Sequence, residues 1–436
     1  MNRLVRRLAK ALKRLMPQAV FDVIDPLGHG LEAWTAALVN GFPGHSLRVI
    51  GITGTNGKTS TAVLTAKVFE EAGYVVGLST TALYQVGPER FANDRNSTVT
   101  NPWDLQRLLA RMRRAGVQIV VLEVTSHALA QNRVAGIRFE GVALTNITQD
   151  HLNYHRTMDR YVAAKAKLFQ KPHLVLSVLN ADDPAGLAFQ SYPAKRHLMY
   201  QLDKPSNIYA TNLHMQGNGT TFTLNYDRAS VEVSLQLPGA YNVANALAAA
   251  GLALGLDLSL DKVGVGLSAL TAVPGRMERI EAGQAFTVIV DYAHTPDALA
   301  NLYGAIRTAT TGRILAILGA AGDRDRTTRP MMGQIVAEHA DLVVLTDDEP
   351  YSEKPAAIRS QIEQGLLKGG ARKGQTYEEI PDRRAAIRHL FGLAKAGDTV
   401  VLTGMGHQQY RITAGVRQPW DERVVARELL AELQGR

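Results

Sequence analysis

A glycine-rich turn at residues 51–61 constrains this chain more than any other feature, because it joins an apolar run to a helical pattern. Apolar residues over 47–52 predict a buried strand, and their spacing over 62–69 predicts the helix that follows. A turn of this kind points backbone N–H groups and the helix dipole at an anion. Lys58 adds a positive charge for phosphate, and Thr59 adds a hydroxyl suited to Mg²⁺.

The turn departs from the strict phosphate-binding pattern at one position. Ile52 stands where that pattern has glycine, and the glycines fall at positions 51, 54 and 57. An ordinary glycine-rich turn is therefore the alternative interpretation. The sequence Gly-Lys-Thr at the predicted start of a helix favours nucleotide binding.

Length and composition predict a globular protein of several domains. The 436 residues are enough for two or three domains, and 46% hydrophobic with 20% charged residues is typical of soluble proteins. No apolar run reaches the length of a membrane span, about 20 residues. Cysteine is absent, which excludes disulfides and thiolate metal sites and fits the cytoplasmic location that we expect.

The formal net charge of +8 is concentrated at the N-terminus. Residues 1–14 carry six basic residues and no acid, and the rest of the chain carries 42 lysines and arginines against 40 acids. Leucines at positions 4, 8, 12 and 15 recur at helical spacing beside these charges. Residues 1–16 therefore predict a helix packed on the body, with weak contact to an anionic membrane surface as the alternative. Nucleic-acid binding is not expected, because the basic excess is confined to this segment.

Short β-branched runs alternate with helical patterns from about residue 47 to 200, which predicts a parallel sheet with helices on both faces. Residues 207–237 alternate polar and apolar side chains and predict antiparallel hairpin strands, and residues 241–256 predict a helix. A second, shorter α/β unit follows Pro274-Gly275. The expected strands are 117–123, 141–146, 174–179, 286–290, 314–318, 342–345 and 399–403, and further expected helices are 105–115 and 158–169.

Polar side chains end two predicted strands of the first unit. Glu123 ends an apolar run, and Asp150 with His151 follows the next one. A carboxylate at a strand end beside a phosphate loop is placed to bind Mg²⁺, directly or through water. A lone histidine there would more often be structural, but a phosphate loop and two polar strand ends at one sheet edge favour a functional role.

Eight segments, in this order and spacing, resemble the Mur ligases and within them the MurE branch, over residues 47–430. They are Thr-Gly-Thr-Asn-Gly-Lys-Thr (53–59), Glu-Val-Thr-Ser-His-Ala-Leu (123–129), Thr-Asn-Ile-Thr-Gln-Asp-His-Leu-Asn-Tyr-His (145–155), Tyr-Val-Ala-Ala-Lys-Ala-Lys-Leu-Phe (161–169), Leu-Pro-Gly-Ala-Tyr-Asn-Val-Ala-Asn-Ala (237–246), Pro-Gly-Arg-Met-Glu (274–278), Asp-Tyr-Ala-His-Thr-Pro-Asp-Ala-Leu (291–299) and Gly-Ala-Ala-Gly-Asp-Arg-Asp-Arg-Thr-Thr-Arg-Pro (319–330). The resemblance implies an α/β fold: a central ATPase domain with a phosphate loop and a mainly parallel sheet, and a C-terminal Rossmann-like α/β domain. We expect a short N-terminal helical segment (1–46), a central domain (47–273) and a C-terminal domain (274–436).

The resemblance implies ATP-dependent amide-bond formation with Mg²⁺. A substrate carboxylate attacks the γ-phosphate to give an acyl phosphate, and an amine then displaces phosphate. The implied catalytic residues are Lys58, Glu123, His151 and Lys165, the last as a carbamate, and the implied metal ligands are Thr59, Glu123, His151 and the Lys165 carbamate. The implied ATP-binding residues are Gly54, Thr55, Asn56, Gly57, Lys58, Thr59, Ser60, Asn242, Asn245, Arg276, Asp291, Tyr292, His294, Asp323 and Arg324. From the residues alone, Asp323 could equally cap a helix, and Lys165 could be a surface lysine.

For the acceptor substrate, a nucleotide-sugar peptide, the resemblance points to Thr80, Thr81, Thr98, Ser126, Gln131 and Arg133. Arg133 is the strongest of these, because a guanidinium pairs well with carboxylate or phosphate. Members of the MurE branch carry a uridine-binding domain before the phosphate loop. Only about 46 residues precede the loop here, so a full domain of that kind does not fit. The acceptor is then held by fewer contacts or with a partner protein, or it is a different carboxylate.

The expected amino-acid site departs from the family pattern at two charged positions. Members that add diaminopimelate show Asp-Asn-Pro-Arg, whereas this chain has Asp348-Glu349-Pro350-Tyr351. The family segment Gly-Lys-Gly-His-Glu reads Gly-Met-Gly-His-Gln here, over residues 404–408. Burying the distal charges of diaminopimelate without partners would be costly, so we expect another amino acid. Candidate residues of the site are Asp348, Tyr351, Gly404, His407 and Gln408.

The sequence thus predicts a ligase that adds an amino acid to a UDP-N-acetylmuramoyl-peptide precursor in cell-wall synthesis. One alternative is a related ligase of the folylpolyglutamate-synthase type with another carboxylate acceptor. The other is an ATP-binding subunit of a complex that has lost catalysis. Retention of Lys58, Glu123, His151 and Lys165 argues against the second alternative.

Overall fold

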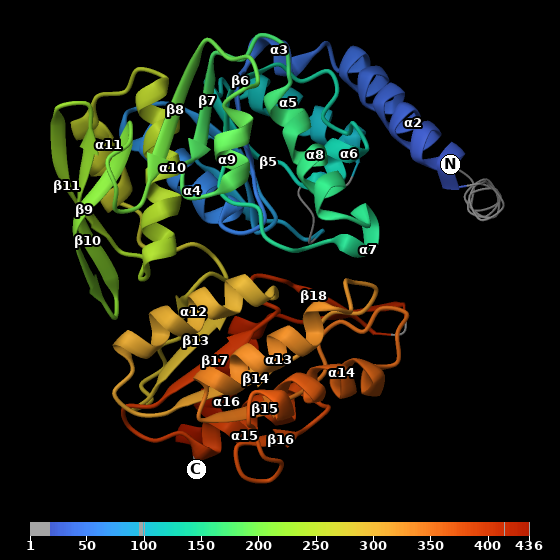
Figure 1. Cartoon of the computed structure of the whole chain (residues 1–436), viewed down its shortest axis with the longest axis vertical. Helices are drawn as coiled ribbons and strands as arrows, with labels where there is room; N and C mark the ends of the chain where they lie inside the picture. Colours follow the sequence, from blue (N-terminus) through green and yellow to red (C-terminus); the bar gives the residue numbers. More distant parts are fainter. Residues whose placement is uncertain (1–17, 96–98, 100, 414, 436) are drawn as a thin grey trace.

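The computed structural model describes residues 18–95, 99, 101–413 and 415–435, and the side chains from residue 24 onward. Two α/β units lie one above the other in Figure 1, each built on its own sheet. This arrangement confirms the predicted α/β fold. The predicted helix over residues 1–16 falls outside the described residues.

The first unit contains an eleven-stranded sheet, parallel in its centre and antiparallel at both edges. In spatial order its strands are β11 (Ala229–Leu235), β10 (Gly219–Tyr226), β9 (Ile208–Gln216), β8 (Arg196–Gln201), β7 (Leu176–Asn180), β6 (Phe139–Leu144), β1 (Arg48–Thr53), β5 (Ile119–Glu123), β2 (Val76–Ser79), β3 (Leu83–Val86) and β4 (Glu89–Ala92). Its helices are α2 (Gln18–Val39), α3 (Pro43–Ser46), α4 (Lys58–Glu71), α5 (Pro102–Arg114), α6 (Ser126–Ala130), α7 (Leu152–His155), α8 (Met158–Phe169), α9 (Pro184–Phe189), α10 (Ala240–Gly255) and α11 (Leu260–Ser268).

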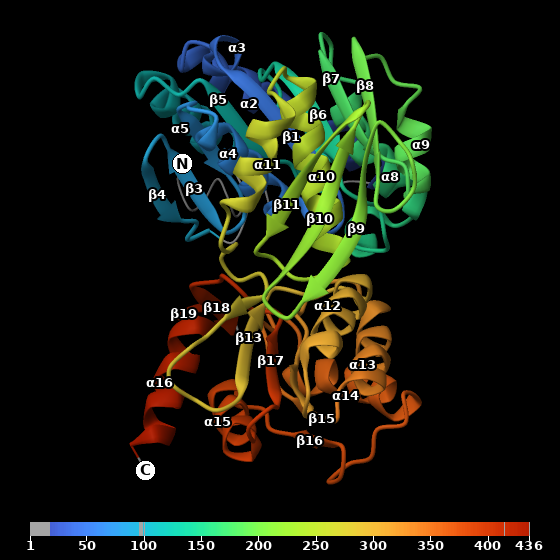
Figure 2. The same ribbon diagram turned by 90° about the vertical axis from the view of Figure 1, so that its left-hand side faces the viewer.

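Burial explains why the central strands could be predicted. Every residue of β2, β5 and β7 is buried, because helices cover both faces of the sheet. Helices α4, α10 and α11 pack on one face, and α5 and α8 pack on the other. Strands buried on both faces read as continuous apolar runs. The hairpin strands predicted over residues 207–237 are confirmed as β9–β11, which extend the same sheet (Figure 2).

The second unit contains a six-stranded sheet in which all pairs are parallel except β12 with β13. In spatial order its strands are β12 (Glu278–Arg279), β13 (Thr287–Asp291), β17 (Thr399–Thr403), β14 (Ile314–Leu318), β15 (Leu342–Leu345) and β16 (Tyr377–Glu379), and a separate hairpin joins β18 (Tyr410–Thr413) to β19 (Val416–Pro419). Its helices are α12 (Pro296–Ala309), α13 (Thr328–His339), α14 (Pro355–Lys368), α15 (Arg383–Leu393) and α16 (Glu422–Gln434).

The apolar cores stay within the units. Of the four clusters of buried apolar residues found in the described chain, two belong to the first sheet and two to the second. Polar contacts join the units instead: Asn56 Nδ2 donates to Asp297 Oδ2 at 2.7 Å, and Tyr410 OH donates to the Arg95 carbonyl at 3.1 Å. The connection passes through Gly275, whose φ of +63° favours glycine.

No helix of the described chain combines the length and the apolar character needed to cross a membrane.

Candidate active site

The phosphate loop runs from the end of β1 at Thr53 to the start of α4 at Lys58, as predicted. Two of its glycines permit close packing that no side chain would allow. Gly54 has φ +154°, and a Cβ there would lie 1.8 Å from Thr145 Oγ1. Gly57 has φ +79°, and a Cβ there would lie 2.1 Å from Asn245 Oδ1. The loop backbone is therefore pressed against β6 and α10, and glycine is required at both positions.

Asn146, which follows β6, fixes the shape of this loop. Its carbonyl accepts from Thr55 N at 2.7 Å, and its side-chain Oδ1 accepts from Asn56 N at 2.9 Å. Thr145 Oγ1 donates to the Asn56 carbonyl at 2.6 Å. Sequence reasoning did not select Asn146, although its place directly after a predicted strand was a usable signal.

Lys58 is folded back over the loop, with Nζ donating to the Thr55 carbonyl at 2.7 Å. Burial lowers the pKa of Lys58, while the charges of Glu123 and Asp150 oppose that shift. An anion bound in the loop would favour the charged form of this amine in the same way. The position of Nζ at the start of a helix is that expected of a phosphate-binding lysine.

Three oxygen-bearing side chains meet beside the loop. Thr59 Oγ1 donates to Glu123 Oε2 at 2.9 Å and lies 3.1 Å from Thr81 Oγ1. Thr81 N donates to the same carboxylate oxygen at 3.1 Å, and Glu123 is buried. Arg276 of the second unit reaches Thr59 Oγ1 with Nη2 at 3.4 Å. Sequence reasoning assigned Thr81 to the acceptor substrate, whereas the structure bonds it to Glu123.

This set of oxygen atoms fits Mg²⁺, which takes a few protein oxygens and completes its shell with water and phosphate. No group of three or more histidine, aspartate or glutamate side chains in the described residues is arranged to hold a metal ion by itself. Thr59 and Glu123 would therefore hold Mg²⁺ together with the phosphates of a nucleotide.

Lys165 is not a surface residue: its side chain on α8 is buried, and Nζ donates to the Gly54 carbonyl at 2.5 Å. The amine also lies 4.5 Å from the centre of the Tyr161 ring. Burial, and secondarily the charge of Lys58, hold the pKa of Lys165 well below its ordinary range. A neutral amine in a buried, polar position is a nucleophile. Tyr161 OH lies 3.0 Å from Thr55 Oγ1, which ties α8 to the loop.

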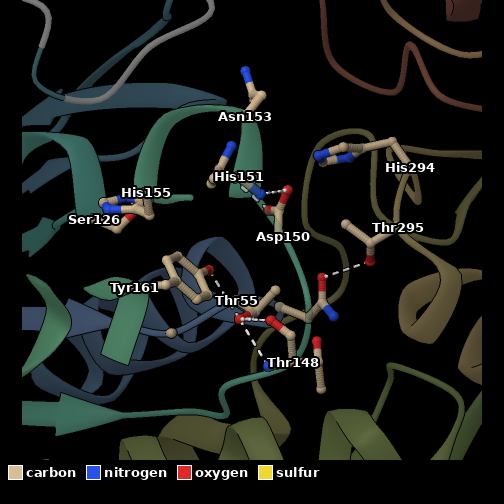
Figure 3. Close-up of polar contacts among 12 residues, drawn as sticks. Thr55, Ser126, Thr148, Asp150, His151, Asn153, His155, Tyr161, His294 and Thr295 are labelled. Carbon is tan, nitrogen blue, oxygen red and sulfur yellow. Dashed lines mark hydrogen bonds and ion pairs between the residues drawn. The ribbon is translucent and has the colours of Figure 1, made fainter. Parts of the chain in front are cut away.

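The rings of three histidines, His127, His151 and His155, lie close together, and Figure 3 shows His151 and His155 beside Ser126 and Asp150. The ring of His127 lies 4.7 Å from that of His151 and 5.5 Å from that of His155. His155 Nε2 lies 3.0 Å from Ser126 Oγ, and His151 Nε2 lies 3.2 Å from Asp150 Oδ2. Burial lowers the pKa of His127 to about 3, that of His155 to about 4, and that of His151 well below its ordinary value. All three imidazoles are neutral at pH 7 and could serve as ligands.

A first cleft, of about 120 Å³, lies between the two units beside the phosphate loop. The predicted ATP-binding residues that line it are Asn56, Gly57, Thr59, Ser60, Asn242, Asn245, Arg276 and Asp291. Asn242 and Asn245 sit near the start of α10, where Asn245 Nδ2 donates to Asn242 Oδ1 at 3.2 Å. The Arg276 guanidinium lies 4.8 Å from the centre of the Tyr292 ring. The phosphate loop, the start of α10 and the segment around Arg276 thus line the same cleft.

A second cleft, of about 60 Å³, lies next to the histidine cluster. The predicted residues that line it are His151, Tyr292, His294, Arg324, Asp348, Gly404 and Gln408. Asp323 is exposed, and its Oδ1 accepts from Ser352 Oγ at 2.7 Å, so its side chain serves a turn. His407 is buried with its ring 4.7 Å from that of Tyr292.

Glu349 organises the floor of the second cleft. Its Oε2 accepts from Tyr351 OH at 3.0 Å and from Gln408 Nε2 at 3.1 Å, and its Oε1 accepts from Ile412 N at 3.1 Å. Burial raises the pKa of neighbouring Asp348 to about 6, although Arg383 opposes the shift. Sequence reasoning noted both departures from the family pattern but did not predict that Tyr351 and Gln408 bond to the same carboxylate.

The described residues predicted for the acceptor lie at turns and at the ends of α6. Thr80 Oγ1 donates to the Leu83 carbonyl at 2.9 Å within a turn. Ser126 begins α6, Gln131 follows its end, and Arg133 donates from Nη1 to the Val99 carbonyl at 2.8 Å. Burial lowers the pKa of Arg133, and the charges of two acids on α2 oppose that shift. Thr98 lies outside the described residues.

Comparison with known proteins supports the resemblance noted above. The model of the Mur ligase middle domain matches residues 52–253, and that of the Mur ligase, glutamate ligase domain matches residues 275–406. A UDP-N-acetylmuramyl-tripeptide synthetase of Roseiflexus sp. is 39% identical over 413 residues, covering 91% of this chain and 81% of that protein. A UDP-N-acetylmuramoyl-L-alanyl-D-glutamate--2,6-diaminopimelate ligase of Bacillus licheniformis is 40% identical over 401 residues, covering 90% and 80%.

Solved structures agree with these matches. A UDP-N-acetylmuramoyl-L-alanyl-D-glutamate--2,6-diaminopimelate ligase superposes with a TM-score of 0.61 at 34% identity, covering 89% of this chain and 79% of that one. The folylpolyglutamate synthase of Mycobacterium tuberculosis complexed with ADP shares the fold, with a TM-score of 0.72 at 19% identity and coverage of 94% and 95%. The phosphate loop and most of both units lie within the matched regions, and the chain belongs to the Mur ligase family.

Proposed function

We propose that this protein is an ATP-dependent ligase that joins an amino acid to a UDP-N-acetylmuramoyl-peptide precursor in peptidoglycan synthesis. One observation carries the proposal: the phosphate loop, the Thr59–Glu123 pair and Arg276 of the opposite unit meet at one cleft. Relatives about 40% identical bear the names of such ligases. ATP and Mg²⁺ are the cofactors that this cleft suits. The domain division is proposed as 1–46, 47–273 and 274–436, and the location as cytoplasmic.

In the first step, a carboxylate of the acceptor attacks the γ-phosphate of ATP, giving an acyl phosphate and ADP. The developing negative charge needs positive charge and hydrogen-bond donors that are already in place. Lys58 and the backbone of the loop supply them on one side, and Arg276 supplies a guanidinium from the other. Mg²⁺ held by Thr59 and Glu123 would neutralise charge on the phosphates.

Lys165 is proposed to act as a carbamate. Its neutral amine adds to carbon dioxide, forming an N–C bond and releasing one proton, which converts a buried amine into an anion. That anion and neutral His151 would complete a second Mg²⁺ site, as the family resemblance implies. The buried position beside Gly54 and the lowered pKa support this role, because both favour the reactive free base.

In the second step, the amine of the incoming amino acid attacks the acyl phosphate and releases phosphate through a tetrahedral intermediate. The second cleft is proposed to hold that amino acid, because Asp348, Glu349 and Gln408 line it beside His151. Carboxylates there suit an ammonium group. Tyr351 and Gln408 stand at the positions of the family's arginine and glutamate, and both bond to Glu349. Diaminopimelate is therefore not the proposed substrate, and an amino acid without a second carboxylate is.

The acceptor is proposed to lie along α6, near Ser126 and Arg133, where a guanidinium could pair with phosphate or carboxylate. Recognition of the uridine diphosphate is proposed to involve few contacts or a partner protein.

The test is phosphate release with ATP, Mg²⁺ and UDP-N-acetylmuramoyl-L-alanyl-D-glutamate, screened against single amino acids with mass detection of the product. One amino acid giving a product of the tripeptide mass is the expected result. Phosphate release and ligation only with a folate or another free carboxylate would assign the chain to the folylpolyglutamate-synthase type instead. ATP binding without turnover on any acceptor would contradict the ligase.

A further inference from the structure

Helix α2 presents its largest apolar side chains to solvent. Six of them, between 49% and 71% exposed, form what we call the apolar stripe: Ile24, Leu27, Leu31, Trp34, Leu38 and Val39. The first five follow one another at intervals of three and four residues, so they lie on one face of the helix. Helices of globular proteins normally turn such a face toward the core.

The opposite face of α2 is built from small residues and packs on the protein. Ala33, Ala36 and Ala37 are fully buried, and a Cβ on Gly136 would lie only 2.7 Å from Cβ of Ala37. Asn132 Nδ2 donates to the Pro26 carbonyl at 3.3 Å, which ties the helix to the segment after α6. The alanines therefore attach the helix to the protein. The apolar stripe stays largely exposed, although the ring of Trp34 lies 5.7 Å from that of Phe42 in an edge contact.

Charged groups of α2 lie off the stripe. Asp25 is buried. Glu32 pairs with His29: the distance from Glu32 Oε2 to His29 Nδ1 is 3.5 Å. The negative charges of both acids also oppose the lowering of the pKa of Arg133 by burial. No lysine, arginine or aspartate is exposed on α2 between residues 24 and 39. An apolar surface of this extent on a single protein marks an interaction site.

The sequence just before α2 identifies the kind of partner. Residues 1–16 contain six lysines and arginines and no acid, with leucines at 4, 8, 12 and 15. A basic sequence interspersed with leucines is typical of segments that bind anionic membrane surfaces. In Figure 1 α2 runs along the edge of the first unit, with its N-terminal end directed away from the body.

We propose that the apolar stripe of α2 binds a membrane surface containing anionic lipid, with α2 lying in the plane of the interface. The six cations in the sequence of residues 1–16 favour lipid of negative charge. Either signal alone binds weakly, whereas apolar burial combined with a polybasic segment gives stable attachment. A second copy of the chain is a poorer occupant. Two such helices packed face to face would bring two sets of six cations together without an acidic surface to offset them.

The first test is sedimentation of the full-length protein with vesicles of 30% phosphatidylglycerol in phosphatidylcholine, compared with pure phosphatidylcholine. We expect binding to the anionic vesicles that weakens as salt rises. Leu27→Ser/Leu31→Ser/Leu38→Ser should lower the vesicle partition coefficient at least tenfold. The matched control is Leu187→Ser/Val265→Ser/Leu367→Ser, which replaces exposed apolar residues on other helices and should leave binding unchanged.

The basic segment is tested separately by charge reversal. Arg6→Glu/Lys10→Glu should abolish the preference for anionic vesicles, whereas Lys204→Glu/Lys262→Glu, which makes the same charge change at exposed sites elsewhere, should not. ATP binding serves as the check that each variant is folded.

The absence of cysteine allows a direct probe of the stripe. An environment-sensitive fluorophore on Leu31→Cys should gain intensity and shift to the blue with anionic vesicles, and the same dye on Leu187→Cys should not. Equal binding by the α2 variant and its control, or absence of binding to anionic vesicles at low salt, would overturn the proposal. A concentration-dependent dimer that the α2 variant abolishes, without vesicle binding, would assign the stripe to a second copy.

Discussion

The two clefts of this protein are lined by different charged groups. The first cleft, which we propose to hold the nucleotide, is lined by Arg276 with Asp291 and Asp297, and it adjoins the phosphate loop and the start of α4. The second cleft, which we propose to hold the amino acid, has more acids: Asp150, Asp325, Asp348 and Glu349 line it together with Arg324 and Arg329, and Glu349 accepts three hydrogen bonds. Under the proposed function, the loop beside the first cleft binds phosphate and the carboxylates of the second bind an ammonium group. Substitutions that add or remove charge at either cleft test this comparison.

The largest effect is expected at the nucleotide cleft. Lys58→Ala removes the buried cation of the phosphate loop and should lower ATP turnover by about 1,000-fold or more, the scale seen when a transition-state charge loses its partner. The measurement is steady-state phosphate release with saturating substrates. Lys67→Ala, on the same helix but paired with Glu71 away from the loop, is the matched control and should stay active. Unchanged turnover in Lys58→Ala would contradict the assignment of the loop.

Next in size is the loss expected in Lys165→Ala, about 100-fold in kcat, because the proposed carbamate contributes an anion that alanine cannot. Acetate or propionate should restore part of the activity by occupying the vacated space. Lys167→Ala, two residues along α8, is the control and should behave as wild type. A Lys165→Ala protein with full activity, or wild-type activity that survives rigorous removal of carbon dioxide, would rule out the carbamate.

The preference among amino acids is expected to change tenfold or more when positions 351 and 408 receive the charged residues that diaminopimelate-adding members of the family carry there. Tyr351→Arg/Gln408→Glu should raise kcat/KM for diaminopimelate relative to the natural amino acid at least tenfold, because the distal carboxylate and ammonium then find partners. Competition between the two amino acids, resolved by product mass, is the measurement. The control is Tyr410→Phe, which changes a tyrosine on β18 whose hydroxyl bonds to the Arg95 carbonyl. An unaltered preference would show that specificity is set elsewhere.

The smallest effect concerns pH. The pKa of Asp348, raised by burial to about 6, means that its carboxylate is largely ionised at pH 7 and mostly protonated at pH 5.5. If the carboxylate receives the ammonium group, KM for the amino acid should rise about fourfold over that interval. Asp348→Asn should remove this dependence.

The raised pKa of Asp348 affects stability in the opposite direction: lowering the pH, which should weaken binding of the amino acid, should make the fold more stable. Because the folded pKa lies above the ordinary value of 3.8, the native state binds the proton more tightly, and stability falls as pH rises from about 4 to 6. Thermal unfolding of wild type and Asp348→Asn over that range measures the difference. A KM profile that is identical in the two proteins would exclude Asp348 from the amino-acid site.

The central strands and the phosphate loop could be predicted because the physics that forms them is local. Strand β5 is an apolar run buried on both faces. The glycines at 54 and 57 indicate a backbone that packs too closely against its neighbours for any side chain. The edge strand β4 was not predicted, since its side chains are mostly exposed and leave no apolar pattern. An edge strand of this kind forms because it pairs with its neighbour, and its own sequence contributes little.

Contacts between distant positions could not be predicted in the same way. Glu349 and Gln408 are 59 positions apart, and only the fold shows that they bond to one another. The apolar spacing of α2 would by itself predict a buried face, because sequence alone does not tell which side of a helix meets the core. In the structure the alanines take that side and the large residues are left outside.

The confinement of each apolar core to one unit has a consequence for the rate of turnover. Polar contacts such as that between Asn56 and Asp297 join the units, so parting them breaks hydrogen bonds rather than an apolar core. If the first cleft holds the nucleotide as proposed, we expect its exchange to follow a hinge motion about Gly275. We expect the release of ADP, rather than bond making, to limit turnover, and the rate to fall as solvent viscosity rises.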